Sequence, residues 1–359
     1  MKTRKIITSL LLTTLCAPLF TSCNSKDNNI ENPEISTGVY VLNEGKYAAN
    51  NASLTYYDFA TGFASADLFL DKNNRGLGDT GQDLIKYGSK IYIAVYKSSI
   101  IEVIDAKTGV STKSIPMKNA NGASSSPRSL TSANGKVYIV LYDGHVAQLD
   151  TTSLTVGQTI AVGANPDASV ISNNKLYVAN TGGMSAVMDS TISVVNLSTF
   201  TEERKITVNL NPAGIKADSY GDIYVISNGN YKLIPGKFQR IEAGTYKVTD
   251  INVKAKNFDI IGDNAYISNF DYDANWQATN KTIAVYDVKN EKLVSENIIT
   301  TSVVKTPYCI DVDPISKDIY LGVTDYANNG KMYCFSQNGT LKFTFTTGIN
   351  PSKVVFVSK

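Results

Sequence analysis

The chain has 359 residues, with 34 lysines and arginines against 32 aspartates and glutamates, so its formal net charge is +2 at pH 7. No basic run alternates with aromatic residues, and the sequence therefore lacks the positive surface on which nucleic-acid binding depends. Hydrophobic residues make up 43 % of the chain, which is enough apolar surface for a folded core.

The first 22 residues have the pattern of a secretion signal. A basic start leads into an apolar stretch that ends in small residues before Cys23. That stretch is shorter than the ~20 residues of a membrane span. The segment 19–23 resembles a bacterial lipobox, so we expect residues 1–22 to be removed and Cys23 to be lipidated; Cys16 follows bulky Leu15 and fits less well. An ordinary cleaved signal with a chance cysteine is the alternative.

Residues 23–37 are polar and contain few large apolar side chains. Such a segment cannot bury enough surface to fold, and we expect it to act as a flexible tether. The folded domain is then expected over residues 38–359.

A short phrase recurs seven times in that domain: a tyrosine between small or β-branched apolar residues. The tyrosines are Tyr40, Tyr92, Tyr138, Tyr177, Tyr224, Tyr266 and Tyr320, at intervals of 52, 46, 39, 47, 42 and 54 residues. Short strands repeated at this period are typical of a β-propeller. We predict an all-β, seven-bladed β-propeller with four strands per blade. A pair of β-sandwiches is the alternative, but seven similar units argue against it.

The third repeat shows the four strands most clearly, at 128–133, 136–142, 145–150 and 155–162. Asn134-Gly135 and Asp143-Gly144 are turn residues that tolerate positive φ. The second strand is apolar on both faces, as expected where neighbouring blades cover both sides of a sheet.

Prolines mark where the first strand of several blades should begin, because proline lacks the amide donor that a central strand position needs. They are Pro127, Pro166, Pro212, Pro307 and Pro351. The domain opens on a second-type strand, whereas residues 350–358 look like a first strand with nothing after it. We therefore expect the C-terminal strand to pair in blade one and close the ring, which leaves no exposed edge between the chain ends.

Few residues suggest chemistry. Cys309 and Cys334 fall on the first and third strands of one repeat, about two strand spacings apart, which exceeds the ~7 Å limit for a disulfide. We expect two free, buried thiols. His145, the single histidine, is interpreted as structural. The segment 271–282 begins like a calcium loop but lacks its glycine and final glutamate. No metal cluster and no activated nucleophile are evident.

In a propeller, the loops after the second and fourth strands share one face. Here those loops are long and rich in aromatic and carboxamide side chains, which suit a bulky, flat ligand rich in amides or hydroxyls. The candidate ligand contacts are Tyr47, Asn50, Asn51, Arg75, Tyr96, Arg128, Tyr142, Asn180, Met184, Asn228, Tyr231, Phe270, Tyr272, Trp276, Tyr326 and Asn328. The alternative is that Asn and Tyr are simply common in exposed turns and that no pocket forms.

Three motifs carry a resemblance to a known family: the Asn-Pro pairs at 165–166, 211–212 and 350–351, the Leu-Tyr-Val-Ala-Asn phrase at 176–180, and the opening at 38–45. The domain resembles the surface-layer, YVTN-type propellers. With the lipobox, it looks like the cobalamin-capture (BtuG-type) lipoproteins of gut Bacteroidetes. Asp27 and Glu31 after the lipidation site resemble the surface-export signal of such lipoproteins.

This resemblance implies non-covalent binding of cobalamin or another corrinoid, without a required cofactor. It also implies a lipid anchor in the outer membrane, facing the cell exterior, and transfer of the ligand to a TonB-dependent transporter of the BtuB type. A glycan-binding or protein-scaffolding propeller is the second hypothesis. An enzyme such as a lactonase, lyase or quinone-dependent dehydrogenase is the third, and the single histidine and single tryptophan argue against its metal- and quinone-dependent forms.

Overall fold

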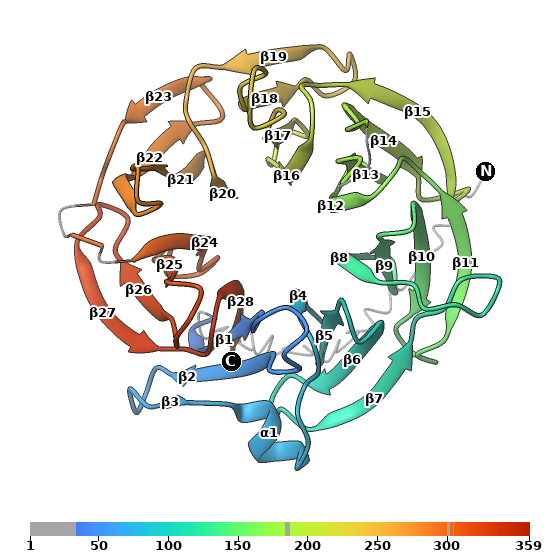
Figure 1. The fold of residues 1–359 in the computed structure, drawn as a ribbon, viewed down its shortest axis with the longest axis vertical. Helices are drawn as coiled ribbons and strands as arrows, with labels where there is room; N and C mark the ends of the chain where they lie inside the picture. The colour runs from blue at the N-terminus through green and yellow to red at the C-terminus, as the bar shows by residue number, and fades with distance from the viewer. Residues whose placement is uncertain (1–33, 184–186, 300–301, 304) are drawn as a thin grey trace, which may run out of the picture. The chain divides into compact units, whose positions relative to one another are not determined.

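The computed structural model describes residues 34–183, 187–299, 302–303 and 305–359. In this part of the chain, seven four-stranded antiparallel sheets follow one another around a ring (Figure 1). The prediction of a seven-bladed β-propeller is confirmed, and the alternative of two sandwiches is wrong. The signal peptide, Cys23 and most of the expected tether lie outside the described residues.

Each blade runs from an inner strand at the channel to an outer strand at the rim. Blade one is β28 (Pro351–Ser358), β1 (Ser36–Asn43), β2 (Ser53–Asp58) and β3 (Ala64–Ser65). Blade two is β4 (Gly81–Tyr87), β5 (Lys90–Val95), β6 (Ile100–Asp105) and β7 (Ser111–Pro116). Blade three is β8 (Pro127–Ala133), β9 (Lys136–Leu141), β10 (His145–Asp150) and β11 (Val156–Ala161). Blade four is β12 (Pro166–Ser172), β13 (Lys175–Asn180), β14 (Thr191–Asn196) and β15 (Thr201–Thr207).

Blade five is β16 (Pro212–Ala217), β17 (Ile223–Ser227), β18 (Lys237–Ile241) and β19 (Val248–Ile251). Blade six is β20 (Asn257–Ile261), β21 (Asn264–Tyr272), β22 (Ala278–Asp287) and β23 (Lys292–Ser295). Blade seven is β24 (Thr306–Val312), β25 (Ile319–Thr324), β26 (Lys331–Phe335) and β27 (Leu341–Thr346). One short helix, α1 (Leu68–Asn73), lies between blades one and two. Among the residues described, no helix has the length and hydropathy to cross a membrane.

The C-terminal strand closes the ring as predicted. β28 pairs antiparallel with β1 from Ser36↔Ser358 to Asn43↔Pro351, so both ends of the domain share blade one. The seven repeated tyrosines lie on the second strands and are buried between neighbouring blades. The hydroxyl of Tyr40 donates to the carbonyl of Ala106 in the next blade at 3.0 Å, and Tyr224 bonds Val288 of blade six in the same way. The tyrosine phrase therefore joins blades as well as filling the core.

Each inner strand pairs with only one strand of its own sheet, which leaves its other edge without ladder partners. Three aspartates satisfy part of this edge by accepting the backbone N–H of the next inner strand, at 2.7, 3.0 and 3.1 Å: Asp83 from Leu130, Asp259 from Val312 and Asp311 from Val354. In two of these aspartates the second carboxylate oxygen pairs with a lysine. Lys216 bonds Oδ1 of Asp259 at 2.7 Å, and Lys353 lies 3.6 Å from Oδ1 of Asp311. The inner wall of the channel is thus held by charge-assisted bonds between blades.

Cys309 on β24 and Cys334 on β26 are free and buried, as predicted. Burial raises the pKa of both thiols, so they remain protonated at neutral pH and behave as small apolar side chains.

Candidate functional site

The inner strands enclose a central channel of about 640 Å³. The loops that follow the second and fourth strands meet at one end of it, and we call this side of the ring the mouth face. The opposite face carries mostly short turns, such as those at 88–89 and 134–135. The predicted asymmetry between the two faces is therefore present.

A β-bulge at the start of six inner strands shapes the mouth. In β8, for example, Pro127 pairs with Leu141 and Ser129 with Val140, so the extra residue Arg128 has no partner on β9. Bulges re-aim side chains and are frequent beside functional sites. The residues at these positions, which we call the mouth ring, are Gln82, Arg128, Asp167, Ala213, Tyr308 and Ser352.

Arg128 is the most constrained member of the mouth ring. Its guanidinium lies 5.2 Å from the ring of Tyr96 and 5.4 Å from that of Tyr142. Its Nε donates to Asp167 at 2.7 Å, Nη2 also pairs with Asp167, and Nη1 donates to Gln82 at 3.2 Å. Three predicted residues therefore form one unit, with two partners that sequence reasoning missed.

Glu44 and Tyr308 form a second polar unit at the mouth. Glu44 follows β1 in blade one, Tyr308 lies on β24 in blade seven, and the tyrosine hydroxyl donates to Glu44 Oε2. Burial raises the pKa of Glu44, while the hydrogen bond from Tyr308 and the charge of Arg128 oppose that shift. Burial and the neighbouring Glu44 also raise the pKa of Tyr308. Neither residue was predicted as a site residue.

An aromatic arc extends from Tyr308 over blades seven and six. Tyr308 lies edge-on to Tyr326 at 5.8 Å, and the hydroxyl of Tyr326 meets that of Tyr272 at 3.1 Å. Tyr272 in turn lies 5.8 Å from Trp276 and 5.2 Å from Phe270. Trp276 is 78 % exposed at the tip of the β21–β22 hairpin. The four predicted aromatic residues of these two blades are thus brought together.

Other predicted contacts stand apart from these units. Tyr47 packs against Lys97 at 4.6 Å, and Tyr231 accepts a hydrogen bond from Asn211 at 3.2 Å. The remaining carboxamides lie in the mouth-face loops: Asn50, Asn51, Asn228 and Asn328. Met184 lies outside the described residues.

Two predicted contacts need correction. Asn180 is completely buried, and its amide bonds Gly163, Thr191 and Ser193, so it holds the loop and is closed to a ligand. Arg75 follows α1, which lies at the rim of the wheel in Figure 1; it packs on Phe69 of that helix at 4.8 Å and forms an ion pair with Glu102 of β6 at 2.8 Å. It therefore anchors the connection between blades one and two instead of facing the mouth.

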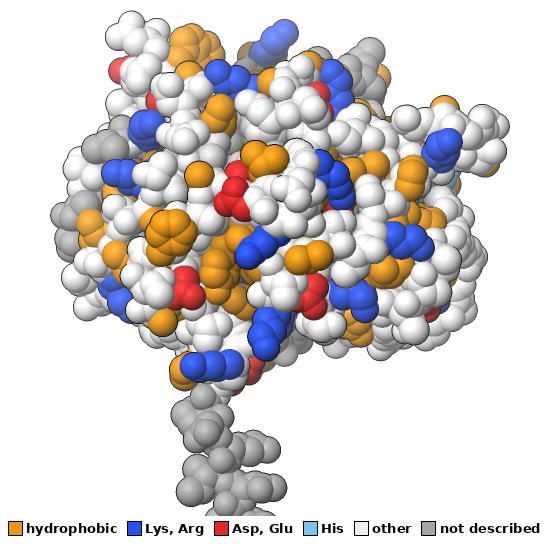
Figure 2. Space-filling view, turned by 90° about the horizontal axis from the view of Figure 1, so that it is seen from below, with side chains coloured by type: hydrophobic (Ala, Val, Ile, Leu, Met, Phe, Trp, Pro, Cys, Tyr) orange, Lys and Arg blue, Asp and Glu red, His pale blue; other side chains and the backbone are white. Residues whose placement is uncertain are grey.

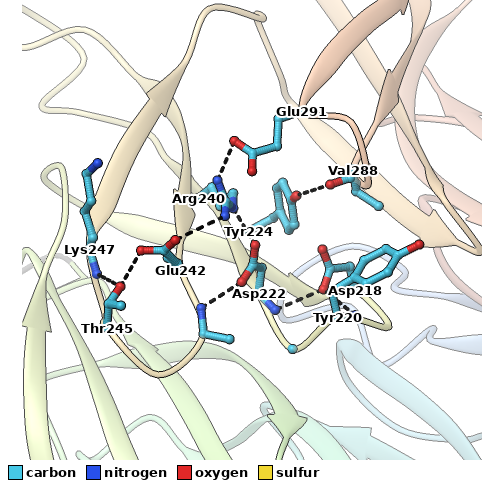
Figure 3. Close-up of polar contacts among 12 residues, drawn as sticks. Asp218, Tyr220, Asp222, Tyr224, Arg240, Glu242, Thr245, Lys247, Val288 and Glu291 are labelled. Atoms are coloured by element: carbon cyan, nitrogen blue, oxygen red, sulfur yellow. Dashed lines mark hydrogen bonds and ion pairs between the residues drawn. The ribbon is translucent and has the colours of Figure 1, made fainter.

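A further charged cluster lies on the opposite face between blades five and six (Figure 3). Arg240 binds Asp222 at 2.5 Å and Glu291 at 2.6 Å, and Asp218 caps the turn before β17 by accepting from the backbone N–H groups of Tyr220 and Asp222. These contacts join blades five and six, and we interpret the cluster as structural.

The side of the domain drawn in Figure 2 shows no cluster of like charge. Figure 2, seen from the side where β2, β3 and α1 lie in Figure 1, shows basic, acidic and apolar side chains interspersed. Within the described ranges, no group of three or more His, Cys, Asp or Glu residues is placed to hold a metal ion. Asp273, in the segment that begins like a calcium loop, accepts from the backbone of Asn275 and Gln277 and so caps a turn. His145 pairs with Asp143 at 3.0 Å.

A family model described as "Domain of unknown function (DUF5074)" matches residues 37–348. The comparison with curated proteins gives no match. Among solved structures, a 6-phosphogluconolactonase-like protein from Bacteroides fragilis is 15 % identical over 89 % of this chain and 98 % of its own, with a TM-score of 0.63. A similar protein from Bacteroides uniformis is 15 % identical over 91 % of this chain and 100 % of its own, also at 0.63. The dihydro-heme d1 dehydrogenase NirN in complex with DHE is 13 % identical over 88 % of this chain and 68 % of its own, at 0.55. Identities this low show the shared propeller fold alone.

Proposed function

The chain belongs to the family described as "Domain of unknown function (DUF5074)", and from its propeller and mouth face we propose that it captures a ligand without transforming it. The proposed ligand is cobalamin or a related corrinoid, bound non-covalently at the mouth face. The proposed recipient is an outer-membrane TonB-dependent transporter of the BtuB type.

The observation that carries this proposal is the concentration of aromatic rings and paired polar groups around one end of the channel. The arc of Tyr308, Tyr326, Tyr272 and Trp276 offers ring faces and edges to a broad, flat ligand. Arg128 of the mouth ring and Glu44, which accepts from Tyr308, add charged hydrogen-bonding groups at the same opening. A corrinoid is broadly flat and rimmed with amides, and the 640 Å³ channel has room for one of its substituents. Because the mouth ring is part of a closed sheet framework, little has to be ordered on binding.

Replacing Trp276 or Tyr272 with Ala should weaken binding of cyanocobalamin about tenfold or more, since each change removes an aromatic contact worth about 1.4 kcal/mol or more. Isothermal titration calorimetry with the purified domain measures this directly. Phe63→Ala is the matched control, because Phe63 is 68 % exposed in a turn on the opposite face. If the unmodified protein at micromolar concentration gives no heat, a corrinoid is not the ligand. If all variants bind with equal affinity, the binding site lies elsewhere on the domain.

A glycan is the second candidate ligand, because the exposed Trp276 and Tyr272 rings at the hairpin tip also suit stacking against sugar rings. A glycan array with the same domain distinguishes the two ligands. If the domain hydrolyses any of a panel of lactones, and a chelator abolishes this activity, then it is an enzyme and the proposal of ligand capture without a reaction is wrong.

We propose that the protein is held at the outer membrane by a lipid on Cys23 and faces the exterior. A tether over residues 23–37 would keep the captured ligand near a transporter at high effective concentration. On intact cells, added proteinase should degrade the domain; protection until the outer membrane is broken would place it on the periplasmic side.

A further inference from the structure

Glu44 and Arg128 approach the same opening from different blades without pairing. Arg128 lies in the mouth ring and forms its ion pair with Asp167, and Glu44 accepts a hydrogen bond from Tyr308, another residue of that ring. Both charged groups therefore lie at the mouth, and each is bonded to a residue other than its counterpart.

Arg128 is held so that only part of its guanidinium is used. A guanidinium has five N–H donors in a planar fork. Asp167 and Gln82 take three donations, and the rings of Tyr96 and Tyr142 flank the group. The unused donors therefore belong to a fixed, preorganised group.

Glu44 is held equally firmly. Its backbone N–H donates to Asn350 at 2.8 Å, its carbonyl accepts from Gly81 at 3.1 Å, and Oε2 accepts from Tyr308. No residue in the described part of the chain donates to Oε1, and the side chain is only partly buried. One carboxylate oxygen thus remains open at the mouth as an acceptor.

We propose that Glu44 and Arg128 form a clamp for a primary carboxamide, in which Arg128 donates to the amide oxygen and Glu44 Oε1 accepts from the amide nitrogen. A carboxamide is the neutral planar group that carries an acceptor and a donor side by side. Glu44 repels a carboxylate in its place, and Arg128 repels an ammonium group, so the clamp selects the amide over both charged analogues. This inference rests on the proposed function, since it names the feature of the ligand that the mouth recognises.

The clamp is tested first with small probes that do not depend on a corrinoid. Ligand-observed NMR on the whole domain with propionamide, propionate and propylammonium should give a preference of at least tenfold for the amide, because hydrogen bonds to charged groups are stronger than those between neutral groups. Glu44→Gln should abolish the preference over propionate, since the repulsion is lost and the new amide can donate to a carboxylate. Arg128→Lys keeps the charge beside Asp167 but loses the fork, and should weaken propionamide binding. Glu242→Gln, a carboxylate of the opposite face, is the control that should change nothing.

Equal binding of propionate and propionamide, no binding of propionamide, or an unchanged preference in Glu44→Gln would each overturn the clamp. Retention of the melting temperature in Glu44→Gln shows that the variant is folded, as expected because Gln can still accept from Tyr308. A parallel titration with cyanocobalamin separates the two proposals. If cyanocobalamin binds and Glu44→Gln leaves its affinity unchanged, capture stands and the clamp fails. If the domain prefers propionamide but does not bind cyanocobalamin, the clamp stands and the proposal of a corrinoid ligand fails.

Discussion

Removal of residues 351–359 should abolish cooperative folding of the domain. These residues contain β28, the inner strand of blade one, and their loss removes the ladder between β1 and β28 from Ser36 to Asn43, leaving β1 paired with β2 alone. Burial of Val354 is lost as well, at about 1.5–3 kcal/mol, along with its hydrogen bond to Asp311 at 3.1 Å. Together with the ladder, these losses are comparable to the 5–15 kcal/mol by which a typical domain is stable. Circular dichroism during heating and size-exclusion chromatography should show a broad transition and association through the exposed edge of β1.

A synthetic peptide of residues 350–359 supplies the control, because it should add back as a strand and restore the sharp transition. A peptide of the same composition in scrambled order should not, since the side chains that face the core would then point elsewhere. A truncated protein with the melting temperature of the full chain would show that the ring does not depend on its closing strand.

Much of this architecture follows from residues that repeat. The tyrosine phrase predicts second strands because a buried strand between two blades is apolar on both faces. The prolines predict where inner strands begin, and Pro127, Pro166, Pro212 and Pro351 do open their strands. The predicted strands of the third repeat agree with β8 to β11 within one residue at each end. Local residue patterns were sufficient to predict these strands because each blade repeats the same pattern.

The mouth was less predictable, because its residues come together only through the bulges and the ring closure. Glu44 and Tyr308 are 264 residues apart and become neighbours because blade seven meets blade one. A usable signal did exist: the residue after each strand-opening proline occupies the bulge, as Arg128, Asp167 and Tyr308 do.

Asn180 shows the opposite error, in which a framework residue was interpreted as a ligand contact. It ends the repeated phrase of blade four, and Asn43 occupies the same place in blade one, where its amide bonds Ser53 and Thr55. A carboxamide that recurs within the repeat serves the fold. The loop composition predicts Tyr231, Trp276 and Tyr326 as contacts but not their backbone conformation: all three adopt positive φ, which bulky residues seldom take.

The second large effect is expected when Lys353 loses its charge. Lys353 lies on β28 inside the channel, 3.6 Å from Asp311, with Asp83 and Asp259 also acting on it. Lys353→Met leaves Asp311 without its nearest cation, while Lys216 still bonds Asp259. Breaking such a pair costs about 3 kcal/mol, the lower end of the usual range because Lys216 remains nearby and the channel admits some water. Urea unfolding at pH 8 measures the loss. Lys237→Met is the control: its partner Asp250 is half exposed, and the change should cost less than about 1 kcal/mol.

The loss in Lys353→Met should depend on pH in a defined direction. Burial raises the pKa of Asp311 to about 6 even with Lys353 opposing the shift. A group whose folded pKa is raised contributes stability at low pH that is lost as the pH rises through that value, here between about 4 and 6. Without Lys353 the folded pKa of Asp311 rises further, so the variant continues to lose stability above pH 6, where the unmodified protein no longer does. The difference in unfolding free energy should therefore be small at pH 4 and largest near pH 8. A difference that is the same at both values would mean that Lys353 acts through packing alone, with no electrostatic part in holding the closing strand.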